Sequence, residues 1–381
     1  MEITHIAVLF FLFTTVLLYA RRRRASPSAY CPHPHTVLGN TVEFIRNRGR
    51  FFDWYTDMLR AAPSNTIEAW GPFGASHAVT TADPAAVDHL LRAKFANYNR
   101  GAQFRAAQSD LIGDGIFGAD GRLWSLQRKL ASYAFSSRSL RRFTQDVLAV
   151  HLGRRLLPFL EAAALSGEAV DLQETLRRFA FDNICHVAFG VESSTFLEWG
   201  DPQHQALFKA FDTAVEISFM RTLTPSTPVR KLTKLLNVGK SRRLREAIGV
   251  IDNHAMSVIE AKEATQRNNN QAEGDPDLLS RMEKLWSENF LEFLPERWLS
   301  DDGEFVAVDA AQYPVFHAGP RACPGKEMAY LQMKTVAAAV LRRFTLNVQA
   351  PTASMESPPA YEMTGGMKIL GGLHVQLKIR D

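Results

Sequence analysis

The sequence predicts a mainly α-helical protein with a minor β part, and two observations support this fold class. After residue 121, apolar residues recur at three- and four-residue spacing over several long segments, which is the period of an amphipathic helix. Short strand-like runs bounded by Gly and Pro occur mainly in residues 66–81 and after Pro351. With 381 residues, 46% of them hydrophobic, the chain can form a large domain with a substantial core.

Net charge and cysteine usage exclude two broad classes of protein. The formal net charge of +4 is small and spread evenly after residue 24, so we expect no nucleic acid partner. The three cysteines, Cys31, Cys185 and Cys323, are far apart in sequence, and their spacing matches neither a disulfide framework nor a short metal-binding motif. This pattern is typical of a reducing compartment and not of a disulfide-stabilised scaffold.

The N-terminus predicts a membrane anchor over residues 1–24. Residues 3–20 carry no acidic or permanently basic side chain, and four arginines follow at 21–24. A helix of that length just spans the hydrocarbon core of a bilayer, and the arginines would stay on the cytosolic side. A cleaved signal peptide is the alternative, but its basic cluster would lie on the other flank. Proline-rich residues 25–40 are expected to form a short, stiff hinge.

The remaining elements are expected in the following order. Residues 66–81 predict a β-hairpin, and Asp83 followed by Pro84 predicts the N-cap and first residue of a helix. A glycine-rich loop covers residues 111–121. Helical periodicity follows in residues 122–135, 145–164, 171–190, 204–220 and 242–264. Residues 265–277 predict a polar linker, and helical periodicity returns in residues 326–344.

Cys323 lies in the segment "PVFHAGPRACPGKE", residues 314–327, just before the helix that we expect to begin at Lys326. A thiolate needs stabilisation as an anion. The unpaired backbone N–H groups at a helix N-terminus, together with the helix dipole, provide it. The position therefore suits a metal-binding thiolate.

The neighbours of Cys323 suit a large, flat, anionic ligand. Gly319 and Gly325 permit tight turns and close approach, Arg321 suits a carboxylate, and Phe316 offers an apolar shield for the sulfur. A haem iron bound by a cysteine thiolate requires these features together. A buried structural cysteine is the better explanation of any one residue alone. For all five positions together, however, chance coincidence is expected on the order of once in ten thousand sequences.

This segment closely resembles the haem-binding loop of the cytochrome P-450 superfamily, the haem-thiolate monooxygenases. The resemblance implies that Cys323 is the axial iron ligand and that Arg321 contacts a haem propionate. Trp124 and Arg128 match the W-x-x-x-R pattern of a helix that contacts the propionates, and their spacing places them on one helical face. The segment "FLPERWL" matches the family's meander, in which Arg297 would join a buried ion network.

The resemblance extends over nearly the whole chain and is strongest to the plant clan of fatty-acid ω-hydroxylases and jasmonate-conjugate oxidases. It implies a cytochrome P-450 domain over residues 41–381, containing haem b and receiving electrons from NADPH through a reductase. The implied reaction inserts one oxygen atom of O2 into a small apolar substrate, such as a fatty acid or derivative. The implied location is the endoplasmic reticulum membrane, with the catalytic domain in the cytosol. Family placement also suggests substrate contacts within residues 105–117.

The family pattern breaks between Arg281 and Met282. There the family has its longest central helix, which carries an acid and a threonine for proton delivery, and a later helix with E-x-x-R. Neither is present in this sequence. Glu43–Arg46 and Glu174–Arg177 spell E-x-x-R but lie far upstream, so we interpret them as coincidental.

We therefore expect an internally truncated cytochrome P-450 fold. Two functional hypotheses follow: a monooxygenase by family, or a non-catalytic haem-binding remnant or mis-spliced product of such an enzyme.

Overall fold

The computed structural model describes residues 10–11, 13–14, 35, 38–72, 77–135, 143–190, 202–223, 232–268, 311, 314–349, 359–364 and 366–380. Within these residues, no helix is long and apolar enough to cross a bilayer. Most of the predicted anchor (1–24) and hinge (25–40) lies outside them. So do the meander segment with Arg297 and the junction at 281/282, and their predictions remain untested.

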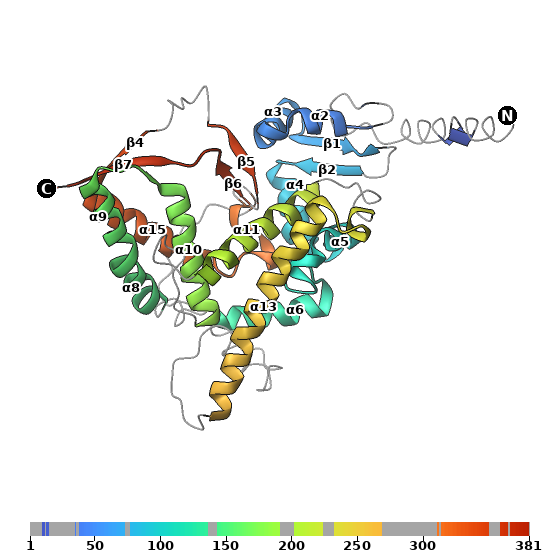
Figure 1. Cartoon of the computed structure of the whole chain (residues 1–381). Helices are drawn as coiled ribbons and strands as arrows, with labels where there is room; N and C mark the ends of the chain where they lie inside the picture. Colours follow the sequence, from blue (N-terminus) through green and yellow to red (C-terminus); the bar gives the residue numbers. More distant parts are fainter. Residues whose placement is uncertain are drawn as a thin grey trace.

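The described chain is mainly helical, with three small sheets in the upper part of Figure 1, where α2 and α3 lie above the β1–β2 hairpin. The helices are α2 (Thr41–Arg46), α3 (Phe51–Ala61), α4 (Pro84–Asp88), α5 (Gly101–Ile112), α6 (Gly121–Ala134), α8 (Ala149–His151), α9 (Leu157–Ser166), α10 (Leu172–Phe189), α11 (Pro202–Leu223), α13 (Gly239–Asn268) and α15 (Lys326–Arg343). Shorter helical turns are η1 (Arg48–Arg50), η3 (His89–Ala93), η4 (Phe95–Asn97), η5 (Phe143–Leu148), η6 (Leu152–Leu156), η9 (Pro314–Phe316) and η10 (Gly319–Arg321).

The strands pair antiparallel in each of the three sheets. One is the β1–β2 hairpin, another has the order β3-β7-β4, and the remaining one pairs β5 with β6. The strands are β1 (Thr66–Trp70), β2 (His77–Thr81), β3 (Val170–Asp171), β4 (Phe344–Val348), β5 (Tyr361–Met363), β6 (Met367–Ile369) and β7 (His374–Ile379). The three-stranded sheet joins β3, from the centre of the sequence, to the C-terminal strands β7 and β4.

Several sequence predictions are confirmed and two element boundaries change. The hairpin pairs Thr66 with Thr81, and the Asp83 carboxylate accepts a hydrogen bond from Ala85 N–H at 2.7 Å as an N-cap. Helix α13 continues to Asn268, into the predicted polar linker. The predicted 145–164 helix is a succession of η5, α8, η6 and α9, because its backbone includes two π-helical turns.

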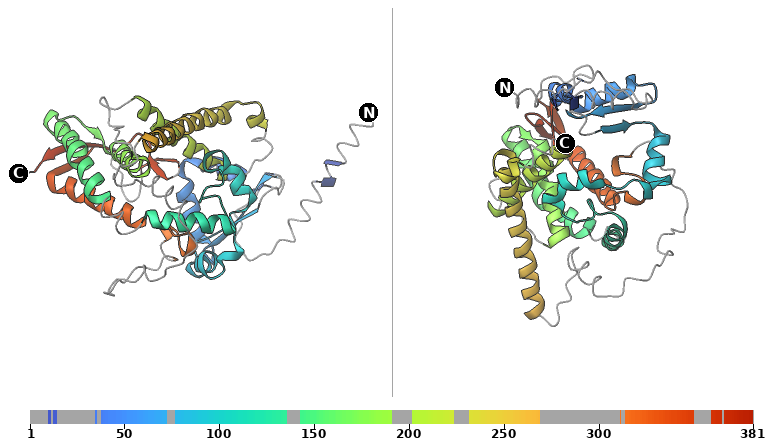
Figure 2. Two further views of the ribbon diagram at one scale, coloured as in Figure 1. Left: turned by 90° about the horizontal axis from the view of Figure 1, so that it is seen from below. Right: turned by 90° about the vertical axis from the view of Figure 1, so that its right-hand side faces the viewer.

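The largest hydrophobic core lies where this helical succession meets α15 and the β4–β7 pair. Its inner face is formed by Leu148, Leu156 and Leu160, each with no exposed surface. Phe344, where α15 ends and β4 begins, is also fully buried in this cluster. Figure 2 shows the C-terminal helix and strands against the α8–α9 segment from a second side. This core holds α15, and with it the segment that precedes α15, in a fixed position.

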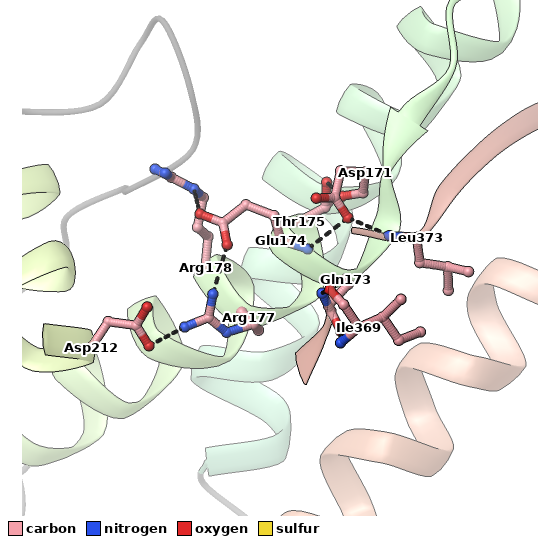
Figure 3. Close-up of polar contacts among 9 residues, drawn as sticks. All are labelled: Asp171, Gln173, Glu174, Thr175, Arg177, Arg178, Asp212, Ile369 and Leu373. Carbon is pink, nitrogen blue, oxygen red and sulfur yellow. Dashed lines mark hydrogen bonds and ion pairs between the residues drawn. The ribbon is translucent and has the colours of Figure 1, made fainter. Parts of the chain in front are cut away.

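The start of α10 is tied to the C-terminal strands by side-chain hydrogen bonds (Figure 3). Asp171 Oδ1 accepts from the N–H groups of Glu174 at 3.2 Å and Leu373 at 3.0 Å. The Gln173 carboxamide accepts from Ile369 N–H at 2.8 Å and donates to Ile369 C=O at 3.2 Å. The bonds to Leu373 and Ile369 connect residues 202 and 196 positions apart in sequence. They fix α10 relative to the C-terminal strands.

In both upstream E-x-x-R matches, Glu43–Arg46 and Glu174–Arg177, the Glu and Arg side chains form an ion pair within one helical turn. On α10, Arg177 donates to Glu174 at 2.8 Å and also pairs with Asp212 of α11 (Figure 3). On α2, Arg46 donates to Glu43 at 3.0 Å. Pairs at this spacing are common on helix surfaces and contribute a few tenths of a kcal/mol, roughly 0.2–0.5. Local helix structure explains their geometry, and their interpretation as coincidental matches to E-x-x-R remains a prediction.

Asn183 on α10 is a buried amide whose hydrogen-bonding capacity is unused. Its exposed fraction is 0%, and neither its Oδ1 nor its Nδ2 has a hydrogen-bond partner among the described residues. A buried polar group without a partner costs about 1–3 kcal/mol. The α10 face at Asn183 therefore carries a penalty that a complementary polar group would relieve.

We predict that Asn183→Leu raises the free energy of unfolding of the 381-residue chain by about 1–3 kcal/mol, because it removes that penalty. The matched control is Gln173→Leu on the same helix, which removes an amide with both of its bonds made. It should lower the free energy of unfolding by a similar amount. Urea unfolding measures both. A destabilised Asn183→Leu variant would contradict the assignment.

Candidate functional site

Cys323 lies in a compact segment formed by η9, η10 and the start of α15. The Cys323 backbone N–H donates to the Phe316 carbonyl at 2.8 Å, which closes this segment on itself. Helix α15 begins at Lys326, as predicted, and the Cys323 side chain is exposed. The thiol is therefore accessible and lies just before the N-terminus of an 18-residue helix, as the sequence predicts.

Gly319 docks this segment onto the turn η3. Its φ of +64° is in the left-handed region, and a Cβ on it would lie 2.0 Å from the Leu91 carbonyl oxygen. Glycine is thus required for both backbone conformation and space. At Gly325, a Cβ would lie 3.4 Å from Phe135 Cε1 and 3.9 Å from Cys323 Sγ. A larger side chain at Gly325 would fill space beside the sulfur.

Phe316 packs its ring against Tyr330 of α15, with 5.1 Å between ring centroids. Its carbonyl accepts the Cys323 N–H, so the residue connects the cysteine to the first turns of α15. The predicted role as an apolar shield for the sulfur remains a prediction. The observed contacts show that Phe316 supports the loop from the helix side.

Arg321 is held by oxygens of the loop before α6. Its Nη2 donates to the Ala119 carbonyl and to Asp120 Oδ1, each at 2.7 Å, and Nη1 lies 3.5 Å from the Ile116 carbonyl oxygen. Only 8% of the Arg321 side chain is exposed. Burial of a guanidinium with an ionic partner and carbonyl acceptors gives a strongly oriented cation.

The Arg321 guanidinium also stacks on aromatic rings. Its Cζ lies 4.7 Å from the centroid of Trp124 and 5.7 Å from that of Phe95. Burial is the main factor that lowers the pKa of Arg321, the charge of Arg100 lowers it further, and Asp120 opposes both effects. Arg321 remains a cation at physiological pH, because arginine side chains stay protonated in proteins.

Helix α6 brings Trp124 and Arg128 to the same site, as their four-residue spacing predicts. Trp124 is 9% exposed and contacts both Phe95 and the Arg321 guanidinium. Burial lowers the pKa of Arg128, and the negative charge of an ionised Cys323 opposes that change. In the described part of the chain, Arg128 makes no hydrogen bond or ion pair. Its charge is therefore available to an anionic ligand near the sulfur.

Two residues of this site, Asp120 and Arg100, are not indicated by any sequence motif. Asp120 accepts from Arg321, from the Arg100 backbone N–H at 3.1 Å, and from Arg105 Nη1 at 2.8 Å. The Arg100 Nε is buried and has no hydrogen-bond partner within the part of the chain that the structure describes. The only signal in the sequence is an acid four residues before Trp124, at the entry to the helix. Nothing local shows that this acid meets the cysteine loop.

The suggested substrate contacts in residues 105–117 divide into two parts. Residues up to Ile112 belong to α5 and do not form a loop. From α5, Asp110 accepts from Arg221 of α11 at 2.8 Å, and Gln108 donates to Thr222 at 2.8 Å. Phe117 is 68% exposed. The α5 side chains thus serve contacts with α11, and a role in substrate binding remains a prediction.

The fold and site define a mainly helical protein with an accessible thiol at a helix N-terminus and arginines beside it. The cytochrome P450 family matches residues 30–282 and 276–365, and the chain belongs to this family. Its members are haem-thiolate monooxygenases with a mainly helical fold, so the predicted family and the mainly helical fold are confirmed, while the membrane anchor and the internal truncation remain predictions.

Relatives from plants align over nearly the whole chain. Cytochrome P450 94B1 of Arabidopsis thaliana is 31% identical, covering 98% of this chain and 95% of that protein. Cytochrome P450 CYP94D108 of Paris polyphylla is 30% identical, with 94% of each covered. Cytochrome P450 94A2 of Vicia sativa is 29% identical, with 92% and 91% covered. The predicted resemblance to this plant clan is confirmed.

The residues present fit a haem. The donor set combines one accessible thiol with Arg128, which has no anionic partner among the described residues, and with the buried, unpartnered Nε of Arg100. Haem b has an iron that binds a thiolate and two propionates that bind guanidinium groups. Arg128 interacts with the charge of Cys323, and Arg100 and Arg321 share the carboxylate of Asp120, so these guanidinium groups suit the propionates of this cofactor.

We predict that Gly319→Ala lowers the free energy of unfolding by about 3 kcal/mol or more, because the new Cβ would collide with Leu91 C=O. Gly121→Ala is the matched control. Gly121 also has a positive φ, of +58°, but a Cβ there meets nothing within 4 Å, so only backbone strain of about 1–2 kcal/mol is expected. Denaturant unfolding compares them. Equal losses would show that Gly319 does not dock the loop.

Proposed function

We propose that this chain binds haem b with Cys323 as the axial ligand, and that it is an internally shortened form of a plant fatty-acid-hydroxylating monooxygenase. The observation that carries the proposal is the exposed Cys323 thiol at the N-terminus of α15, beside arginines from α6 and the preceding loop. A structural cysteine would be buried and would need no such surroundings.

Cys323 would bind the iron as a thiolate. The start of α15 places Cys323 beside backbone N–H groups, and Arg128 lies close enough for its charge to interact with the sulfur. Phe316 and Gly325 would shape the protein surface beside the sulfur, Phe316 by supporting the loop and Gly325 by leaving it uncrowded. Gly319 would act indirectly, by docking the loop on η3.

The propionates would be held by Arg321, Trp124 and Arg128, with Arg100 as a further candidate. Arg321 and Trp124 are in contact with each other, so they would act as one unit. Guanidinium groups suit carboxylates because they offer directed, charge-assisted hydrogen bonds. When bound, the haem supplies one-electron chemistry and dioxygen activation, with electrons from NADPH through a reductase.

The proposed substrate is a small apolar molecule, a fatty acid or a fatty-acid derivative. This proposal rests on the resemblance to the plant clan and on the relatives of the 94 series. The same resemblance, together with the apolar run and arginines at residues 3–24, supports anchoring in the endoplasmic reticulum membrane with the domain in the cytosol.

An internal deletion at 281/282 is the second part of the proposal. The family match is divided into two segments that meet at residues 276–282. The alignment with the Arabidopsis relative extends over 498 positions although this chain has 381 residues, so more than a hundred positions of that alignment have no residue here. A spliced product, an error in the gene prediction or a pseudogene would each produce this pattern.

The energetic consequence of such a deletion is large. A central helix buries apolar area that contributes about 25 cal/mol per Å², so several hundred Å² would rival a net stability of about 5–15 kcal/mol. The orphaned amide of Asn183 is consistent with a missing polar partner. The alternative function, a non-catalytic haem-binding remnant, is favoured by the absence from this sequence of the proton-delivery pair and the downstream E-x-x-R.

We predict that Cys323→Ala abolishes the thiolate-type spectrum of the reduced, carbon monoxide-bound protein and weakens haem binding by more than about tenfold. Cys185→Ala is the control, because Cys185 is buried and burial raises the pKa of its thiol to about 12. It should keep the spectrum. Haem titration followed by difference spectroscopy measures both variants. A thiolate spectrum that survives Cys323→Ala would exclude this ligand.

We also predict that the purified 381-residue chain, reconstituted with haem and a plant reductase, does not hydroxylate a fatty acid at the expense of NADPH. The reason is that its sequence lacks the residues that deliver protons for oxygen activation. The control is the same chain with the corresponding segment of a relative inserted at 281/282, which should regain turnover. Substrate hydroxylation by the unmodified chain, detected by mass spectrometry, would overturn the deletion argument.

A further inference from the structure

We infer that Asp120 is a positioning residue of the proposed haem site: it holds the Arg321 guanidinium in the orientation that receives a haem carboxylate. The inference rests on the haem-binding part of the proposed function and adds to it a residue that no motif indicates. Asp120 would not touch the haem itself. It would act through Arg321.

The hydrogen bonds of Arg321 divide its donors into two groups. Both hydrogens of Nη2 are used, one by Asp120 Oδ1 and one by the Ala119 carbonyl, each at 2.7 Å. Nη1 has only a long contact of 3.5 Å to Ile116 C=O. A guanidinium has five N–H donors in a rigid plane. Fixing Nη2 therefore orients the plane and leaves Nε and Nη1 donors for a carboxylate ligand.

Asp120 also relieves repulsion among the arginines. Its carboxylate is 14% exposed and binds Arg321 and Arg105 as ion pairs at 2.7 and 2.8 Å, besides accepting the Arg100 backbone N–H. Arg100 and Arg321 repel each other. One carboxylate among several guanidinium groups lets the cluster form but leaves it net positive. That excess charge suits two propionates.

The opposite role, competition between Asp120 and a propionate for Arg321, predicts the opposite sign. In that case, removing the carboxylate would free a donor and tighten haem binding. The geometry favours positioning, because Asp120 occupies only Nη2 and the cluster has more cations than this one carboxylate neutralises. The sign of the change in haem affinity therefore decides between the two roles.

The experiment is a haem titration of the full chain carrying Asp120→Asn. The matched control is Asp114→Asn, which makes the same charge change in the same loop at an exposed side chain. We expect haem affinity to fall roughly tenfold for Asp120→Asn and to change by less than about twofold for Asp114→Asn. Asp120→Glu, which keeps a carboxylate, should recover part of the loss.

Two further measurements separate positioning from a general effect on folding. With iron protoporphyrin IX dimethyl ester, which has no free carboxylates, Asp120→Asn should bind as tightly as the unmodified chain. In an Arg321→Met background, Asp120→Asn should cause no additional loss of haem affinity, because the residue through which it acts is gone.

The inference is wrong if Asp120→Asn matches Asp114→Asn, binds haem more tightly, or loses the same affinity for the dimethyl ester as for haem. These outcomes leave the proposed function intact as long as the unmodified chain binds haem. An unmodified chain that binds no haem would instead contradict the proposed function, and this inference would fall with it.

Discussion

The buried guanidinium of Arg321 is the contact on which the organisation of the site depends. It joins the Cys323 segment to the loop before α6, since Arg321 and Asp120 are 201 positions apart in sequence. Separating the two segments would leave a buried cation without its anionic partner, which is strongly destabilising, so this ion pair favours keeping them in contact. The Trp124 ring of α6 stacks on the same guanidinium. Arg321 therefore connects α6 as well as the preceding loop to the Cys323 segment.

This contact bridges the proposed deletion. The loop before α6 lies upstream of residues 281–282 and the Cys323 segment lies downstream, yet each supplies half of the proposed haem site. The downstream half is supported by the core in which α15 and Phe344 are buried. The proposed cofactor site is therefore built by segments on both sides of the proposed deletion, whereas the proton-delivery residues would belong to the deleted segment. The proposal thus predicts that haem binding and turnover are separable in this chain.

Local sequence patterns predicted the longer helices after residue 121, whereas α2, α3 and α5 were not predicted. The start of α15 at Lys326 and the shared face of Trp124 and Arg128 follow from spacing along one element. Asp120 could not be found in this way, because its function depends on Arg321, two hundred residues away. The contact between Gly319 and Leu91 C=O is equally non-local. The π-helical turns that interrupt the 145–164 helix have no counterpart in hydrophobic periodicity.

We conclude that contacts within the chain itself, without haem, hold the Cys323 segment and the loop before α6 in place. Amide hydrogen exchange on the haem-free 381-residue chain tests it most directly. The account predicts that the Cys323 N–H, bonded to Phe316 C=O, and the Arg100 N–H, bonded to Asp120, exchange slowly before any haem is added. Exchange of both amides at the rate of an unfolded chain would contradict the account.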